Sequence, residues 1–176
     1  MVNKFKTWLA DSKPVMPVIV IDDLDHVEPL AKALVAGGVT LLEVTLRTPH
    51  ALEAIAIIKE TVPEAIVGAG TVRSEQDLAS VIEAGAQFAV TPGLTANLIQ
   101  AYKQQTEWGG VLIPGVATAS EVMNAYEAGF RIMKAFPAHA IGGLEVLKAW
   151  QGPQIWWWIF KETFTEEKGR LVEKGG

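Results

Sequence analysis

The 176-residue chain contains no cysteine, which excludes disulfide bonds, thiolate catalysis and zinc sites with cysteine ligands. Only three histidines could supply imidazole ligands, His26, His50 and His139, and they do not cluster in the sequence. We therefore expect no metal site. His26 and His50 precede helical segments, and His139 follows a strand, so each is expected at the surface.

Positive charge and long apolar stretches are also scarce. The formal net charge is −5, so the chain lacks the broad basic surface that nucleic acids or anionic membranes attract. No run approaches the roughly 20 apolar residues of a membrane span. The N-terminal segment carries Lys4 and Lys6 but no apolar run after them, unlike a signal peptide. We expect a cytoplasmic protein without nucleic-acid or membrane partners.

The residues that are present suit one globular domain, because 49% are hydrophobic and 20% are charged. Short β-branched runs alternate with Ala/Leu/Glu-rich segments of helical length, a pattern typical of strand–helix units. Candidate strands begin near Met16, Val39, Ala65, Gln87, Val111 and Arg131.

A repeat marks the ends of three of the predicted helices, where Ala-Gly precedes the next strand. The glycines are Gly37 or Gly38, Gly85 and Gly129, and each suits a left-handed residue that closes a helix. The strands are almost wholly apolar, as expected when both faces of a parallel sheet are covered. Two architectures fit six such units, an open doubly wound sheet and a (β/α)8 barrel.

Two observations favour the barrel. No Gly-x-Gly-x-x-Gly turn follows the first strand, which weakens the dinucleotide-binding version of the open sheet. Polar residues instead recur at the carboxyl ends of several strands, where barrel enzymes place their active sites. The sequence therefore predicts an α/β protein of the (β/α)8 barrel class.

Lys134 is the first candidate for chemistry, because it is the only lysine that interrupts a predicted strand. Burial among apolar neighbours disfavours the charged ammonium, and a neutral amine can attack a ketone to form an imine. From position alone, a strand-end lysine that reaches solvent or a buried carboxylate is an equally good interpretation.

Glu43 lies among leucines and a valine on the second predicted strand. A carboxylate in such surroundings must be paired, hydrogen-bonded or protonated. Glu43 and Lys134 fall on the second and sixth strands, and alternate strands of a barrel contribute to the same inner layer. They could therefore form a general acid/base beside an imine-forming lysine, or a structural buried pair.

Other candidates follow the strands. Arg47 comes at the end of the second strand, where a guanidinium can hold a carboxylate, although most such arginines are simply solvated. Thr71 follows Gly68 and Gly70, which allow something to approach the backbone closely or simply make a tight turn. Pro92 and Pro114 are expected to end the fourth and fifth strands and to shape the mouth.

Seven collinear motifs closely resemble 2-keto-3-deoxy-6-phosphogluconate (KDPG) and 4-hydroxy-2-oxoglutarate (KHG) aldolases, over about residues 5–153. They are Met-Pro-Val-Ile-Val-Ile (16–21), Ala-Lys-Ala-Leu-Val-Ala-Gly-Gly-Val (31–39), Leu-Glu-Val-Thr-Leu-Arg-Thr (42–48), Ile-Val-Gly-Ala-Gly-Thr-Val (66–72), Ala-Gly-Ala-Gln-Phe-Ala-Val-Thr-Pro-Gly (84–93), Leu-Ile-Pro-Gly-Val (112–116) and Lys-Ala-Phe-Pro-Ala (134–138).

The resemblance implies a (β/α)8 barrel that assembles as a trimer and cleaves a 2-keto-4-hydroxy acid to pyruvate and an aldehyde, without a metal or another cofactor. It implies that Lys134 forms the imine and that Glu43 is the general acid/base. Arg47 and Thr71 would bind the pyruvate-derived carboxylate and keto end, and Pro92 would line the pocket.

The resemblance ends near residue 153. The family continues into a strand ending in Pro-Thr-Gly-Gly and a further Gly-Gly-Ser loop, which hold the substrate phosphate, and neither motif is present here. We therefore expect a barrel portion over 1–153, truncated after the sixth unit, and an atypical tail over 154–176. In the tail, 154–160 could form a seventh strand and 165–174 a short helix.

The three consecutive tryptophans of the tail suggest an origin for it. Tryptophan has one codon, and a frame shift turns its repeat into glycine or valine codons, so we expect a reading-frame slip near Pro153. Two functions remain open: an aldolase that forms the imine, and a catalytically impaired relative without the phosphate-binding strands. A nucleotide-binding module would need a phosphate loop, which the sequence lacks.

Overall fold

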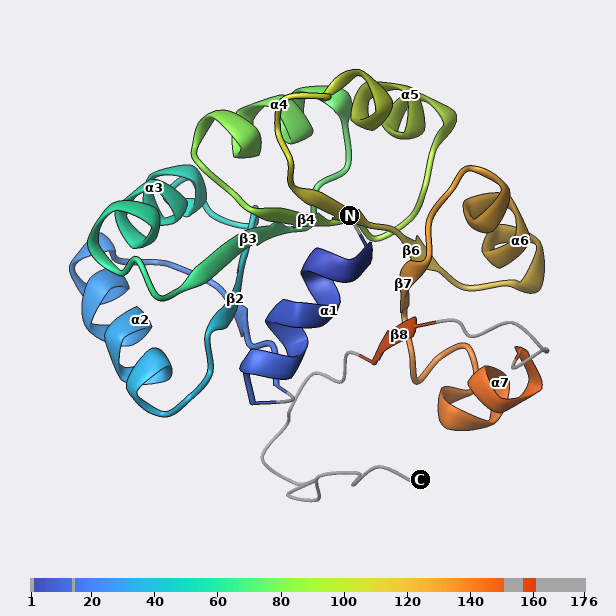
Figure 1. Ribbon diagram of the computed structural model, residues 1–176, viewed down its shortest axis with the longest axis horizontal. Coiled ribbons are helices and arrows are strands. Elements are labelled where there is room, and N and C mark those ends of the chain that lie inside the picture. The colour runs from blue at the N-terminus through green and yellow to red at the C-terminus, as the bar shows by residue number, and fades with distance from the viewer. Residues whose placement is uncertain (1, 14, 151–156, 161–176) are drawn as a thin grey trace.

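The computed structural model describes residues 2–13, 15–150 and 157–160, in which parallel strands form a curved wall with helices on its convex side (Figure 1). The strands are β1 (Val18–Ile19), β2 (Leu41–Thr45), β3 (Ile66–Gly70), β4 (Phe88–Val90), β5 (Val111–Ile113), β6 (Gly115–Val116), β7 (Ile132–Ala135) and β8 (Trp157–Phe160). The helices are α1 (Val2–Asp11), α2 (Val27–Ala36), α3 (Ala51–Thr61), α4 (Glu75–Glu83), α5 (Ala96–Gln104), α6 (Ala119–Glu127) and α7 (Gly143–Trp150), with a 3-10 turn at Leu24–His26.

All strand pairs in the wall are parallel. One sheet has the order β1-β2-β3-β4-β5, and the other has the order β6-β7-β8. Only Pro114 separates β5 from β6, so the same stretch of chain belongs to both sheets and the wall runs on through it. This arrangement, with a helix after β1, β2, β3, β4, β6 and β7, is that of the (β/α)8 barrel class, as the sequence predicts.

Six predicted strands are confirmed, and the fifth, β5, ends at Ile113 directly before Pro114, as the sequence predicts. The sequence does not reveal the short strand β6 that follows. Pairing resumes immediately at Gly115, which lies opposite Lys134 in the register. Proline lacks the N–H that would continue the ladder to β4, whereas its carbonyl still accepts a hydrogen bond from Lys134 N at 2.8 Å. Pro114 therefore transfers the strand from one neighbour to the other.

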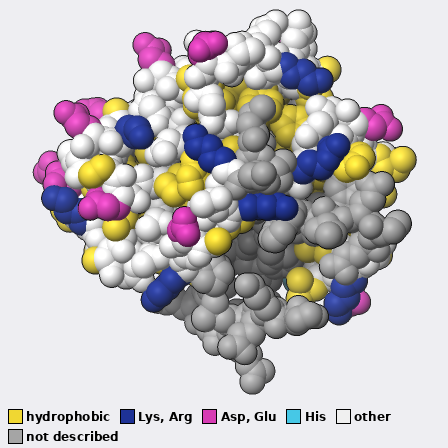
Figure 2. Space-filling view, viewed as in Figure 1, with side chains coloured by type: hydrophobic (Ala, Val, Ile, Leu, Met, Phe, Trp, Pro, Cys, Tyr) yellow, Lys and Arg dark blue, Asp and Glu magenta, His cyan; other side chains and the backbone are white. Residues whose placement is uncertain are grey.

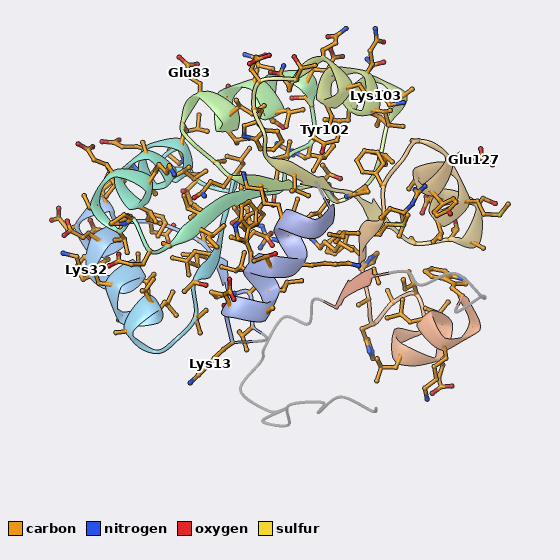
Figure 3. All side chains as sticks on the ribbon, viewed as in Figure 1. Lys13, Lys32, Glu83, Tyr102, Lys103 and Glu127 are labelled. Carbon is orange, nitrogen blue, oxygen red and sulfur yellow. The ribbon has the colours of Figure 1, made fainter. Side chains whose placement is uncertain are left out.

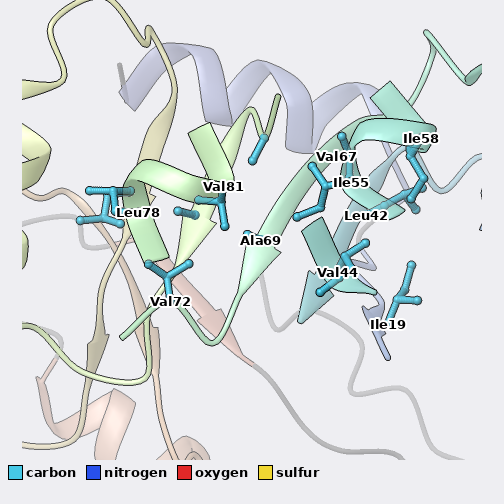
Figure 4. Close-up of a cluster of buried hydrophobic side chains, with 14 of the residues drawn as sticks. Ile19, Leu42, Val44, Ile55, Ile58, Val67, Ala69, Val72, Leu78 and Val81 are labelled. Atoms are coloured by element: carbon cyan, nitrogen blue, oxygen red, sulfur yellow. The ribbon is translucent and has the colours of Figure 1, made fainter. Parts of the chain in front are cut away.

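Alternation along each strand separates two layers of apolar side chains. Residues on the convex face, such as Leu42, Val44 and Val67, pack with α2, α3 and α4 in the larger core (Figure 4). Residues on the concave face, such as Leu41 and Ile132, form a second cluster. Because side chains alternate, Glu43 shares the concave face with Leu41, and Lys134 shares it with Ile132.

The concave cluster is completed by α1, a helix that the sequence interpretation missed. Phe5 of α1 is fully buried and meets Phe88 edge to face, with ring centroids 5.8 Å apart. Leu41 and Phe88, which α1 covers, are the first residues of their strands. Helix α1 therefore closes the amino-terminal end of the wall, and Figure 1 shows it lying across the concave side.

The helix ends follow local chemistry. Gly38, Gly85 and Gly129 have positive φ angles of 84°, 90° and 103°, so the predicted left-handed closures are confirmed at Gly38 rather than Gly37. Ser74 and Thr118 begin α4 and α6 with capping boxes, in which each hydroxyl accepts a backbone N–H and a carboxylate three residues later reciprocates. His26 and His50 stand at the N-caps of α2 and α3.

Strand β8 lies within the segment 154–160, in which a seventh strand is expected, and pairs with β7 so that Trp157 is opposite Ile132. Within the described residues, no pairing joins β8 to β1. The helix expected over 165–174 lies outside the described residues. The division into a barrel portion over 1–153 and a tail stays a prediction.

On the face shown in Figure 2, the described residues carry charged side chains of both signs together with apolar side chains. Figure 3 shows Lys32, Glu83, Lys103 and Glu127 on the outer helices, and all four are exposed. Among the residues that the structure describes, no helix is both long enough and apolar enough to cross a membrane.

Candidate active site

Lys134 is the third residue of β7, and its side chain is only 4% exposed. Its neighbours in the strand are all buried and apolar, and its Nζ lies 4.3 Å from the centroid of the Phe136 ring. The alternative interpretation of a lysine whose amine reaches solvent does not fit this burial. The amine instead lies on the concave face of the wall, where it can contact a molecule bound on that face.

Glu43 is 0% exposed and occupies the middle of β2, also on the concave face. In the register it is opposite Gly68, but its carboxylate leans along the wall toward Gly70, nearer the carboxyl end of β3. A Cβ added at Gly70 would lie 2.8 Å from Glu43 Cδ and closer still to Oε1. The carboxylate therefore fills the space that the missing side chain leaves.

The other glycine of β3, Gly68, leaves space for an aromatic ring nearer the amino-terminal end of the wall. A Cβ added at Gly68 would lie 2.5 Å from Cδ1 of Phe88. Phe88 in turn packs against Phe5 of α1. The aromatic rings thus form an apolar floor, and Glu43 extends from this floor toward the carboxyl ends of the strands, so the predicted close approach at both glycines is confirmed.

Thr71 follows β3 and has a φ angle of 64°, the only positive φ of a non-glycine residue among those that the structure describes. This region is costly for a β-branched residue, by about 1–3 kcal/mol, and such strain concentrates at functional sites. The structure therefore gives Thr71 a feature that the sequence did not reveal. Arg47 lies just beyond β2 and is exposed, so its guanidinium is accessible at the carboxyl edge of the wall.

Thr91 connects the strand ends that present Pro92. Its backbone N–H donates to Ile113 O at 3.1 Å, and its buried hydroxyl donates to Gly93 O at 2.6 Å. The same hydroxyl accepts a hydrogen bond from Gly115 N at 3.3 Å. Since Gly115 is the register partner of Lys134, this hydroxyl links the Pro92 turn to the strand beside the lysine. The sequence predicts the mouth at Pro92, but it does not reveal this role of the Thr91 hydroxyl.

His139 is exposed, as the sequence predicts for a loop histidine. Among the described residues, no group of three or more His, Asp or Glu side chains is arranged to hold a metal ion. The polar groups that the structure gathers on the concave face and its carboxyl edge are thus an amine, a carboxylate and hydroxyls, with a guanidinium nearby. This is a set suited to nucleophilic and acid–base chemistry.

A cavity of about 240 Å³ lies elsewhere, at the amino-terminal ends of β5 and β7. Tyr102 and Lys103 of α5, labelled in Figure 3, contribute to its lining together with Phe130 and Arg131. Burial raises the pKa of the Tyr102 phenol above its ordinary value, while a hydrogen bond with the Leu112 backbone opposes the shift. The cavity is separate from Lys134 and Glu43, which lie on the concave face.

The strain at Thr71 leads to a prediction in which stability and activity change in opposite directions. Thr71→Gly should raise the free energy of unfolding by up to about 2.5 kcal/mol, because glycine relieves about 1–3 kcal/mol of strain at the positive φ but adds about 0.5–1 kcal/mol of backbone entropy to the unfolded chain. The same change should lower kcat/KM, because the hydroxyl is lost. Urea unfolding and steady-state kinetics measure the two effects.

Thr71→Ser is the matched control, since it keeps the hydroxyl and should retain most of the activity. A Thr71→Gly variant that is less stable by more than about 1 kcal/mol and fully active would show that the strained threonine has only a structural role.

Comparisons with known proteins agree with this geometry. The family model described as KDPG and KHG aldolase matches residues 8–156. The 2-dehydro-3-deoxy-phosphogluconate aldolase of Dickeya dadantii is 56% identical over 154 residues, which cover 84% of this chain and 71% of that protein. The KHG/KDPG aldolase of Escherichia coli shows the same identity and coverage.

Solved structures give the same result. The 2-keto-3-deoxy-6-phosphogluconate aldolase of Zymomonas mobilis, determined with 3-phosphoglycerate, matches with a TM-score of 0.75 and 51% identity over 81% of this chain and 66% of that one. The KDPG aldolase of Legionella pneumophila, with pyruvate captured as a covalent carbinolamine intermediate, matches with a TM-score of 0.74 and 47% identity over 79% of this chain and 66% of that one.

This chain therefore spans about two thirds to 71% of the length of these relatives. The family match extends over most of the chain and includes Glu43, Arg47, Thr71, Pro92 and Lys134. The identity to the curated relatives is far above the level at which only the fold is shared. The chain belongs to the KDPG and KHG aldolase family, whose members are Schiff-base-forming lyases.

Proposed function

We propose that this chain is a class I aldolase that cleaves 2-keto-4-hydroxy acids, such as 2-dehydro-3-deoxy-6-phosphogluconate or 4-hydroxy-2-oxoglutarate, to pyruvate and an aldehyde. The observation that carries the proposal is the burial of Lys134 and Glu43 on one concave face of the wall. The pyruvate carbinolamine captured in the Legionella pneumophila relative supports the same chemistry.

Lys134 supplies the nucleophile. Its neutral amine adds to the keto carbon, and the resulting carbinolamine takes up a proton from solvent and loses water to give an iminium ion. Nζ lies over the face of the Phe136 ring, 4.3 Å from the ring centroid, so the ring can hold the protonated side chain when no substrate is bound.

Glu43 moves the protons. As the bond between C3 and C4 breaks, the carboxylate accepts the proton of the C4 hydroxyl, the aldehyde leaves, and the electron pair passes into the iminium to give an enamine. Return of a proton to C3 regenerates the iminium, and water then releases pyruvate and the free lysine. Each step balances without an external oxidant or reductant.

The surrounding groups orient the substrate. Arg47 is assigned to the carboxylate of the keto acid, which a guanidinium can bind through two parallel hydrogen bonds. Thr71 is assigned to the keto end, and Pro92 to the wall of the pocket. We also propose a cytoplasmic homo-oligomer, a trimer; exposed Met123 on α6 and Leu144 on α7 offer apolar contacts, and sedimentation equilibrium tests the assembly.

Reduction by borohydride in the presence of millimolar pyruvate tests the function directly. An aldolase accumulates the pyruvate iminium, so reduction should fix one adduct per chain, and peptide mass spectrometry should find it on Lys134. A folded chain that gains no adduct would instead be the catalytically impaired relative, and the proposed function would be wrong.

A further inference from the structure

We propose that Gly70 is a positioning residue, because the space left by its missing side chain holds the Glu43 carboxylate in the place where it transfers protons. This inference rests on the proposed function and adds a determinant of the same site. Gly70 itself would touch neither substrate nor reacting atoms, and it would act through Glu43.

A side chain at residue 70 would collide with Glu43. A Cβ at Gly70 would lie 2.8 Å from Glu43 Cδ and 3.0 Å from Cγ, and closer again to Oε1. Real Cβ atoms essentially never come within 3.0 Å of such neighbours. Any side chain at residue 70 would therefore displace the carboxyl end of Glu43, which is the part of the side chain that would transfer protons.

Buried neighbours limit the positions that a displaced Glu43 carboxylate could take. Glu43 is 0% exposed, with buried residues before and after it in β2. Below it, the Phe88 ring occupies the space over Gly68, so the carboxylate cannot retreat toward the amino-terminal end of the wall. Displacement must move it away from β3, and a shift of about 1 Å can cost about 100-fold in rate.

The two glycines of β3 leave space for different side chains. Gly68 and Gly70 lie two residues apart, so they share the concave face of β3. Gly68 gives space to an aromatic ring of the floor, whereas Gly70 gives space to a carboxylate. The chain thus contains a matched control, in which the same substitution crowds the floor.

The test measures two partial reactions of pyruvate, iminium formation and proton exchange, and neither needs the aldehyde. Borohydride trapping reports iminium formation at Lys134, and exchange of the pyruvate methyl protons with D2O, followed by NMR, reports proton transfer at C3. The ratio of exchange to trapping isolates the proton-transfer step from general damage to the protein.

Gly70→Ala should lower this ratio on the order of 100-fold, because trapping survives while the displaced carboxylate transfers protons poorly. Gly68→Ala should lower the thermal midpoint and leave the ratio within about threefold of the parent's. An unchanged ratio in Gly70→Ala, or an equal fall in both variants, would overturn the inference.

A double variant adds a reciprocal test. Glu43→Asp shortens the side chain and should lower exchange in the parent, but it should restore exchange in the Gly70→Ala background, because the shorter chain leaves room for Cβ. We expect coupling on the order of tenfold or more, as for residues in direct contact. Additive effects of the two substitutions would contradict the proposed contact.

The same set of variants covers the possibility that Gly70→Ala does not fold. In that case the double variant should fold, because Glu43→Asp removes the clash, and its ratio should match that of Glu43→Asp alone within about threefold. If the double variant also fails to fold, the space is not reserved for the carboxylate and the inference is wrong. A parent chain that traps no pyruvate would instead overturn the proposed function.

Discussion

Lys134→Ala should abolish the borohydride-dependent pyruvate adduct and lower kcat/KM for aldol cleavage by on the order of 10⁴–10⁶-fold, the range expected when a covalent nucleophile is removed. Lys134 is 4% exposed on the concave face, whereas Lys32 and Lys148 are exposed and paired with glutamates on their own helices. No other lysine interrupts a strand among the described residues, so no neighbour can take over its role.

Lys134→Arg distinguishes loss of the nucleophile from loss of positive charge. A guanidinium stays protonated and is a poor nucleophile, so this variant should also fail to trap pyruvate. Lys148→Ala is the matched control, because Lys148 is 65% exposed and its removal should leave trapping unchanged. Retained trapping in either Lys134 variant, with peptide mapping to another lysine, would assign the nucleophile elsewhere.

Much of the fold could be predicted from the sequence, because the strands of a covered parallel sheet are apolar along their whole length. The run around Leu42 and Val44 is of this kind, and a polar residue within such a run, Glu43 or Lys134, is conspicuous. Alternation along the strands then places both on one face. The left-handed residues that end helices at Gly85 and Gly129 could also be predicted, because the same Ala-Gly pair precedes a strand in both places.

What the sequence could not provide depends on contacts between distant segments. Helix α1 carries its apolar residues Phe5, Trp8 and Leu9 at helical spacing, a short signal whose meaning comes only from the floor that it covers. The positive φ of Thr71 is imposed by its surroundings, since threonine does not favour it.

The role of Pro114 illustrates the same limit. Proline within an apolar run indicates the end of a strand, and the sequence interpretation followed this rule. In the structure, its carbonyl pairs with β7 while the missing N–H interrupts pairing with β4. The local rule therefore places the end of β5 correctly, but it does not reveal that pairing resumes with β7 at Gly115.

Glu43→Gln should slow the proton-transfer steps by roughly 10²–10⁴-fold while iminium formation remains measurable, which is the usual contribution of a positioned acid/base. The amide is nearly the same size as the carboxylate, so it should still fit over Gly70 and above the Phe88 ring. Because the geometry is retained, the loss reports the missing basic oxygen rather than a rearranged site.

Exchange of pyruvate methyl protons in D2O, compared with borohydride trapping of the same samples, measures this effect without depending on the aldehyde. Glu121→Gln is the control, because the Glu121 carboxylate closes the capping box of α6. Glutamine can also complete a capping box, so the change should cost at most about 1 kcal/mol of stability, through the lost charge at the helix N-terminus, and leave exchange unaltered. A loss of less than tenfold in Glu43→Gln would make Glu43 a structural partner of the site, and the proton acceptor would have to be a bound water or a group of the substrate itself.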